Sequence, residues 1–552
     1  MKNLMQYMPA LAVALAAVSV SSSIAVAAEK STAPLFDGMG RHHRTVTTAS
    51  KLAQRYFNQG LTLCYGFNHT EAVRSFRGAL KADPNCAMAH WGIAYASGPH
   101  VNRPMTAEDH GRAWSAITNA VALKAAAAPI ERALIEAMAT RYTPEFTEDR
   151  AALDKEFAAA MRNVVREYPD DLDAQTIFAE ALMDTMPWDY WLKDRSPKPE
   201  TEEALAALKF VIKRDPNHPG ATHYYIHAVE AGPQPELGLP SADRLSELVM
   251  QSGHLLHMPS HIYVRVGQYE DAELSNRRAI KADRSYIQSC AIQGFYPGVY
   301  YPHNEHFLWY AFYFQGRSAD AIKAAKKVET LARENYCGPN QVLEAPRFRH
   351  LPTLTQARFG RWEEILKVPQ PPATNDFLID RAMWHFTRGL AFAASGRPGD
   401  AAREHVELSK LRGSETAKAL DLPTFPAAGI LAVADEWLAG KVAEAQGKTA
   451  EAVEHLRKAV EAEDALPYME PSFWPVPVRP ALGAVLLRAG RPAEAEAVFR
   501  EDLQLWPRNG WGLLGLERSL RAQDKSETAE SVRREFENAW KRADAKLELA
   551  WF

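Results

Sequence analysis

The chain has 552 residues, a formal net charge of −4 and the composition of an ordinary water-soluble protein. It carries no basic stripe and no polybasic run, so we expect neither nucleic acid nor an anionic membrane surface as a partner. So long a chain exceeds what one small core requires, which indicates several domains or a repeat array.

Residues 1–27 have the order of a secretory signal sequence. Lys2 gives a positive start, an apolar run follows over residues 11–20, and small residues stand at 25–27. We expect cleavage after Ala27 and export, to the periplasm. The alternative is an N-terminal membrane anchor, for which the run is short, because a span needs about 20 residues. No other segment is long and apolar enough to predict stable membrane insertion.

Residues 28–48 are predicted as an N-terminal extension, and repeats begin after them. One 34-residue unit carries small, aromatic and proline residues at positions 4, 8, 20, 24, 27 and 32, namely Tyr56, Gly60, Ala72, Phe76, Ala79 and Pro84. Small residues let two helices approach closely, the aromatic fills the gap between them, and proline stops the second helix. In spacing and residue type the unit resembles the tetratricopeptide repeat (TPR). The resemblance implies an all-α fold, an α-solenoid of antiparallel helix pairs wound into a right-handed superhelix.

The same spacing recurs along most of the chain. A glycine followed five residues later by alanine marks positions 15 and 20 at Gly267/Ala272, Gly316/Ala321, Gly396/Ala401, Gly447/Ala452 and Gly490/Ala495. We expect nine to eleven helix pairs in two parts. Residues 49–380 would hold repeats with insertions, and residues 381–552 would hold regular repeats that stabilise or dock.

The insertions lie near residues 99–108, 187–199, 232–240, 283–302 and 335–346, and several are rich in aromatic residues. Long loops on a rigid array often carry function. The other interpretation is that they pack as extra structure between repeats.

Histidine is concentrated in the centre of the chain. Eight of the 18 histidines lie between His218 and His306, where even spacing would place about three. The resemblance implies that positions 2, 5, 9 and 12 of each first helix face the concave surface. The residues that fall on these positions are His223, His227 and Glu230; His254, His257 and His261; His303, His306 and Tyr310; and His350.

Helix geometry supports this register, because residues spaced i, i+3 or i+4, and i+7 share one face of a helix. Pro259 interrupts the second set. Either the helix bends there, or it begins at Pro259 and the two earlier histidines reach the site from the preceding turn.

Imidazoles that converge from several helices are typical of a transition-metal site. The predicted metal ligands are His223, His227, His254, His257, His261, His303, His306 and His350. One ion needs fewer donors than this, so a dinuclear centre is also possible. Copper is favoured by the nitrogen-rich set and by export, with zinc or iron as alternatives. The predicted catalytic residues are Glu180, Asp184, Glu230 and Tyr310, as general bases or further ligands.

The leading hypothesis is therefore a periplasmic metalloenzyme that oxidises a small organic substrate in copper or iron chemistry, or hydrolyses one with metal assistance. The alternatives are a scaffold that holds a peptide in its groove and a metal storage or delivery protein. The chain lacks the Gly-x-Ser-x-Gly, phosphate-loop and His-Glu-x-x-His motifs.

The four cysteines form no Cys-x-x-Cys pair, so a thiolate zinc site is not expected. Cys290 and Cys337 fall in loops of neighbouring repeats and could form a disulfide. Cys64 and Cys86 fall at opposite ends of one helix pair, where we expect no bridge.

Overall fold

The computed structural model describes residues 33–290, 295–336, 348–422 and 425–548. The predicted signal sequence, Cys337 and most of the insertion near residues 335–346 lie outside these ranges, so export and the Cys290–Cys337 disulfide stay predictions. The chain divides into two compact units. Unit 1 comprises Met1–Ile262 and Arg278–Pro297, and unit 2 comprises Tyr263–Arg277 and Gly298–Phe552. The division predicted at residue 380, between repeats with insertions and regular repeats, stays a prediction.

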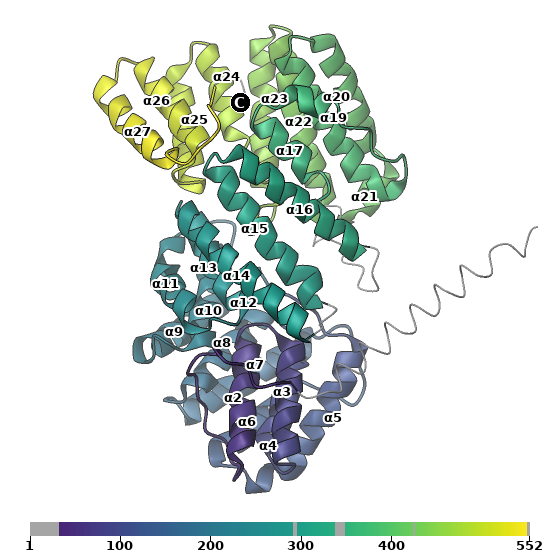
Figure 1. The fold of residues 1–552 in the computed structure, drawn as a ribbon, viewed down its shortest axis with the longest axis vertical. Helices are drawn as coiled ribbons and strands as arrows, with labels where there is room; N and C mark the ends of the chain where they lie inside the picture. The colour runs from purple at the N-terminus through teal and green to yellow at the C-terminus, as the bar shows by residue number, and fades with distance from the viewer. Residues whose placement is uncertain (1–32, 291–294, 337–347, 423–424, 549–552) are drawn as a thin grey trace, which may run out of the picture. The chain divides into compact units, whose positions relative to one another are not determined.

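Helices that follow one another in unit 1 pack as pairs (Figure 1). They are α2 (Lys51–Tyr65), α3 (His69–Ala82), α4 (Ala87–Ala96), α5 (Ala107–Leu123), η1 (Lys124–Ala126), α6 (Pro129–Ala139), α7 (Ala151–Glu167), α8 (Leu172–Asp184), α9 (Pro199–Arg214), α10 (Pro219–Glu230), η2 (Pro235–Gly238), α11 (Leu239–Leu248) and α12 (Gly253–His257). Three elements contribute residues to both units, α13 (Pro259–Arg265), α14 (Tyr269–Cys290) and η3 (Tyr296–Tyr300).

Unit 2 continues the paired arrangement and contains one short hairpin. Its elements are α15 (Tyr301–Phe314), α16 (Ser318–Tyr336), α17 (Leu351–Arg358), α18 (Trp362–Leu366), η5 (Asn375–Phe377), α19 (Leu378–Ala394), α20 (Pro398–Arg412), α21 (Glu415–Ala419), β1 (Asp421–Leu422), β2 (Phe425–Pro426), α22 (Ala427–Ala445), α23 (Thr449–Asp464), α24 (Arg479–Arg488), α25 (Pro492–Leu505), α26 (Gly510–Arg521) and α27 (Ser526–Ala539). The two strands pair antiparallel. The predicted all-α fold of helix pairs is confirmed.

The turn between the two helices of a pair explains the glycine spacing. The glycines at 267, 316, 360, 396, 447 and 490 all adopt left-handed backbone conformations, with φ between 66° and 77°. Glycine reaches this region without the steric penalty that other residues meet. The alanines five residues after five of these glycines, at 272, 321, 401, 452 and 495, are fully buried. The structure therefore confirms the predicted repeat register at these turns.

Two further features bear on predictions from the sequence. Cys64 and Cys86 are buried free thiols. No helix among the described residues combines the length and the apolar character that crossing a bilayer requires.

Helix α10 approaches α2 closely because of a glycine in its first turn. A Cβ atom on Gly220 would lie 2.6 Å from Cδ1 of Tyr65. The Tyr65 ring is fully buried, and its hydroxyl donates a hydrogen bond to Asp173 Oδ1 at 2.6 Å. The ring therefore has no room to move away, and the position of α10 depends on the missing side chain at 220.

We predict that Gly220→Ala lowers the free energy of unfolding by roughly 1–3 kcal/mol, the usual cost of overpacking a tight contact. Gly111, an exposed glycine of α5, is the matched control, since a Cβ there would meet nothing within 4 Å. Gly111→Ala should instead stabilise the protein by about 0.5–1 kcal/mol. Urea denaturation of both variants is the measurement, and equal stability of the two would contradict the packing argument.

A buried carboxyl group in α25 makes stability depend on pH. Asp502 is fully buried and accepts a hydrogen bond from Asn509 Nδ2 at 2.9 Å. Burial raises the pKa of Asp502 to about 6, although Asn509 and Arg358 act in the opposite direction. The folded protein therefore holds this proton more tightly than the unfolded chain, whose aspartates have a pKa of about 4.

The contribution of Asp502 to stability should be complete below pH 4 and lost as the pH rises through about 6. We predict that wild type loses roughly 2–3 kcal/mol relative to Asp502→Asn between pH 4 and pH 7.5. Urea denaturation at both pH values measures this difference. Parallel pH profiles of the two proteins would show that Asp502 does not titrate in this way.

Candidate metal centre

Three imidazoles of unit 1 bring their nitrogens together. His223 and His227 come from α10 and His254 from α12, and one nitrogen of each lies within 4.8 Å of the others. All three side chains are at most 2% exposed. The Nε2 atoms of His223 and His254 are 3.2 Å apart. Two nitrogens bound to one tetrahedral ion at about 2.05 Å lie about 3.3 Å apart, so this spacing suits a shared ion.

Hydrogen bonds at the other ring nitrogen decide which atom can bind a metal. His223 Nδ1 lies 2.6 Å from the Tyr65 carbonyl oxygen, and His227 Nδ1 lies 2.7 Å from Glu230 Oε1. Both oxygens only accept, so each Nδ1 carries the proton and each Nε2 carries a lone pair. His227 Nε2 has no hydrogen-bond partner within the described ranges.

Burial also selects the neutral form of these rings. Burial lowers the pKa of all three, most strongly those of His223 and His254, each of which also faces neighbouring imidazoles. A neutral imidazole is the form that binds a metal, because a protonated ring has no lone pair to offer. His223 and His227 therefore each offer a neutral Nε2 lone pair. His254 Nε2 donates a hydrogen bond to His223 Nε2, or becomes a third donor when its proton is on Nδ1.

Glu230 at the end of α10 is shared between two histidines. Its Oε1 accepts from His227, and its Oε2 accepts from His261 Nδ1 at 2.5 Å. Burial alone would raise the pKa of this carboxyl, but the two imidazoles overcome it and lower the pKa to about 2. Carboxylates that hold the outer nitrogen of a ligand histidine are typical of metal sites. Glu230, predicted as catalytic, thus occupies the place of an orienting residue.

His257 and His261 form a second pair of donors in unit 1. Their Nε2 atoms are 2.9 Å apart, and His257 Nδ1 lies 3.3 Å from Ser260 Oγ. His261 Nδ1 donates to Glu230, so His261 Nε2 carries a lone pair that can accept from His257 Nε2–H. The dinuclear centre stays a prediction.

The chain path at Pro259 follows the second alternative predicted from the sequence. Helix α12 ends at His257, and α13 begins at Pro259. Met258 joins the two and donates its N–H to the His254 carbonyl at 3.0 Å. His254 and His257 consequently reach the site from the turn before the helix that carries His261.

Sequence reasoning missed Phe67, which lies among these histidines. Its ring centroid is 4.6 Å from that of His223, 5.7 Å from His227 and 5.3 Å from His254. It also lies 5.0 Å from His100. Phe67 is 3% exposed, and its ring closes one side of the centre.

The backbone of Phe67 is left-handed, with φ of 52°. Phe67 stands five residues before Ala72, so it occupies the turn position that later repeats give to glycine. A bulky side chain in this region costs roughly 1–2 kcal/mol. A missing turn glycine before Ala72 was the available signal in the sequence.

The insertion at residues 187–199 places a second strained aromatic against the centre. Trp188 has φ of 64°, and its ring lies edge-on to His227 with 5.1 Å between centroids. Trp191 Nε1 donates to the Ala228 carbonyl of α10 at 3.0 Å. This insertion therefore packs on α10 and also contacts a candidate ligand.

The predicted catalytic carboxylates of α8 have other partners. Glu180 accepts a short hydrogen bond from the Tyr95 hydroxyl, and burial raises the pKa of Glu180. Asp184 is paired with Arg141 at 2.7 Å. Among the described residues, neither joins a group of donors spaced for a metal ion.

The remaining predicted residues belong to unit 2. His303, His306 and Tyr310 lie on α15, where His306 stacks on Trp309 at 5.3 Å and Tyr310 packs edge-on to Trp506 at 6.1 Å. Their participation in a metal centre stays a prediction.

The register predicted for His350 is wrong. Helix α17 begins at Leu351, so His350 is the residue that precedes the helix rather than a residue of its second turn. Pro352 occupies the first turn of α17, a position where proline favours the start of a helix.

A further polar group has a structural role and is not a candidate metal site. It consists of His42, Asp173 and His218. Asp173 Oδ1 accepts from His42 Nε2 at 2.9 Å, from His218 Nε2 at 3.2 Å and from the Tyr65 hydroxyl. His218 Nδ1 accepts from the Ala221 N–H, so both of its nitrogens are occupied. The group ties the N-terminal segment and α8 to the start of α10.

No protein-family model matches this chain, and a comparison with curated proteins finds no match. Among solved structures, it is similar to the APC/C hetero-tetramer Cut9–Hcn1, with a TM-score of 0.30, 13% identity and coverage of 86% of this chain and 78% of that one. It is also similar to the human IFIT1 dimer with m7Gppp-AAAA, with a TM-score of 0.31, 12% identity and coverage of 90% of this chain and 91% of that one. The similarity to yeast Tom70 has a TM-score of 0.29 and 12% identity, and it covers 87% of this chain and 89% of that one.

The paired helices, the left-handed glycine turns and the buried alanines described above make the chain an array of helix pairs that resembles tetratricopeptide repeats.

Proposed function

We propose that this protein binds a transition-metal ion through the Nε2 atoms of His223, His227 and His254, and that the bound metal acts on a small organic substrate. The observation that carries the proposal is the pair of fixed Nδ1–H groups. The Tyr65 carbonyl and Glu230 hold the protons of His223 and His227 on the outer nitrogens, which leaves Nε2 available.

Three histidine ligands favour an enzyme over a closed structural site. Structural zinc sites use four protein ligands, whereas catalytic sites commonly use three and keep one position for water or substrate. Nitrogen donors suit copper, zinc, iron and nickel, and copper binds most tightly among divalent ions. Copper or iron would supply oxidation and zinc would supply hydrolysis, with export to the periplasm as part of the proposal.

The first test is metal binding by the purified protein after removal of adventitious metal. We predict one tightly bound Cu(II) per chain at His223, His227 and His254, with nitrogen couplings in its electron paramagnetic resonance spectrum. His227→Gln and His254→Gln should each weaken binding at least tenfold and reduce the number of coupled nitrogens, because each removes a donor. Competition with a chelator of known affinity measures the change.

His455→Gln is the matched control, because His455 is partly exposed in unit 2 and paired with Glu436 at 2.8 Å. It should bind copper as wild type does. Equal affinity in all three variants, or a chain that retains no copper, zinc or iron after loading, would contradict the proposal. Tight binding without turnover of any substrate would favour storage or delivery.

Glu230→Gln tests the orienting role of the shared carboxylate. A glutamine amide has only one accepting atom, so it cannot take the N–H groups of both His227 and His261. We predict metal affinity 10–100 times lower with unchanged stoichiometry, the usual effect of losing such a partner. Glu236→Gln, an exposed change in η2, is the control. Wild-type affinity in Glu230→Gln would show that this carboxylate does not position the ligands.

A further inference from the structure

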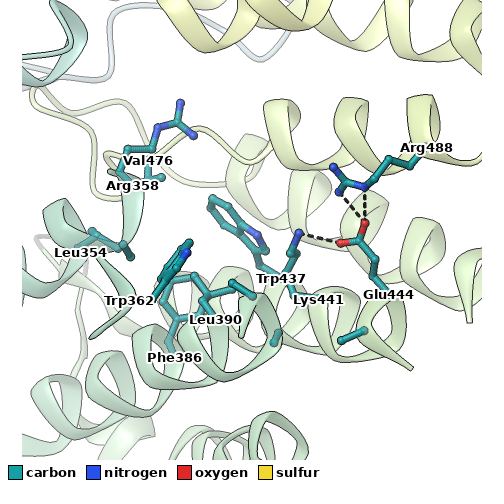
Figure 2. Close-up of a pocket in the computed structure, with 14 residues that line it drawn as sticks. Leu354, Arg358, Trp362, Phe386, Leu390, Trp437, Lys441, Glu444, Val476 and Arg488 are labelled. Carbon is teal, nitrogen blue, oxygen red and sulfur yellow. Dashed lines mark hydrogen bonds and ion pairs between the residues drawn. The ribbon is translucent and has the colours of Figure 1, made fainter. Parts of the chain in front are cut away.

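Unit 2 contains a cavity whose walls are mainly apolar (Figure 2). It has a volume of about 200 Å³ and opens to solvent, which leaves room for a small organic molecule. Trp362, Phe386, Leu390 and Trp437 supply much of its wall. They come from α18, α19 and α22, so helices of more than one repeat shape the cavity.

One end of the cavity is charged, as the dashed lines in Figure 2 show. Glu444 accepts from Lys441 Nζ at 2.7 Å through one oxygen and from Arg488 at 2.5 Å through the other. The residues that line the cavity include three cations, Arg358, Lys441 and Arg488, and one carboxylate, Glu444, so cationic groups are in excess. A ligand cation would be repelled there, whereas an anion would be attracted.

Trp437 supplies an indole N–H that the protein does not use. Its side chain is 5% exposed, and Nε1 has no acceptor within the described part of the chain. Buried indole N–H groups usually have a partner. Trp437 and Lys441 are four residues apart on α22, so their side chains share one face of that helix.

We propose that this cavity binds a small organic anion with an apolar body. Its carboxylate would accept from Trp437 Nε1–H and pair with Lys441, and its apolar part would pack against Trp362, Phe386 and Leu390. A neutral apolar molecule would leave the indole N–H unpaired, so the anionic group gives the selectivity. This site is separate from the histidine centre of unit 1 and does not depend on a metal.

Isothermal titration of the full chain with octanoate, octanol and octylamine tests the proposal. These probes share an eight-carbon body and differ in the polar group. We expect octanoate to bind at least tenfold more tightly than octanol, and octylamine to bind most weakly. Equal binding of octanoate and octanol would overturn the assignment of an anion, and so would preferential binding of octylamine.

Two substitutions separate the roles of the polar groups. Lys441→Met removes the charge and keeps the aliphatic chain, and Trp437→Phe removes the N–H and keeps an aromatic wall. Lys441→Met should weaken octanoate binding at least tenfold, and Trp437→Phe should weaken it several-fold. Neither substitution should weaken octanol binding to a comparable extent. Circular dichroism confirms that each variant is folded.

The control is Lys448→Met, which removes an exposed lysine paired with Glu451 on the surface. It should bind octanoate as wild type does. If Lys441→Met and Lys448→Met bind octanoate equally well, the carboxylate does not lie at Lys441 and the proposal is wrong.

Discussion

The position of a single proton on each buried imidazole governs the chemistry available to this protein. A histidine whose Nδ1–H is held by an acceptor presents the lone pair of Nε2, and a histidine without such a partner can present either nitrogen. The Tyr65 carbonyl fixes His223, and Glu230 fixes His227 and His261 together. Because one carboxylate serves two rings from different helices, the arrangement of α10 relative to α13 sets the geometry of both groups of donors.

The same constraint connects the centre to the rest of unit 1. Tyr65 uses its carbonyl oxygen to orient His223 and its hydroxyl to reach Asp173 on α8. Gly220 lets α10 approach the Tyr65 ring closely, and His223 of the same helix contacts the Tyr65 carbonyl. The packing of α2, α8 and α10 therefore sets the orientation of the His223 imidazole. For this reason a substitution at Gly220 would change both the stability of the protein and the geometry of the site.

The sequence allowed much of this arrangement to be predicted, because the repeat register depends on side chains with strong preferences. Turn glycines and buried alanines located the helices, and the i, i+4, i+7 spacing placed His223, His227 and Glu230 on one buried face. The count failed at His350, because α17 begins only at Leu351. The Tyr65 carbonyl could not be predicted, because every residue has a carbonyl and only the fold brings this one to a histidine.

Phe67 shows why a departure from the repeat pattern is informative. Glycine at this turn would avoid the strain of a left-handed backbone, yet the chain places a phenyl ring there, against three candidate ligands. The ring excludes water from one side of the imidazoles, and exclusion of water is the main cause of their lowered pKa values. The neutral imidazole is the form that can bind a metal, so the strained position of this ring is consistent with the proposed metal centre. Trp188, also left-handed, contacts the same group of histidines, and two such exceptions at one centre are better explained by its chemistry than by packing alone.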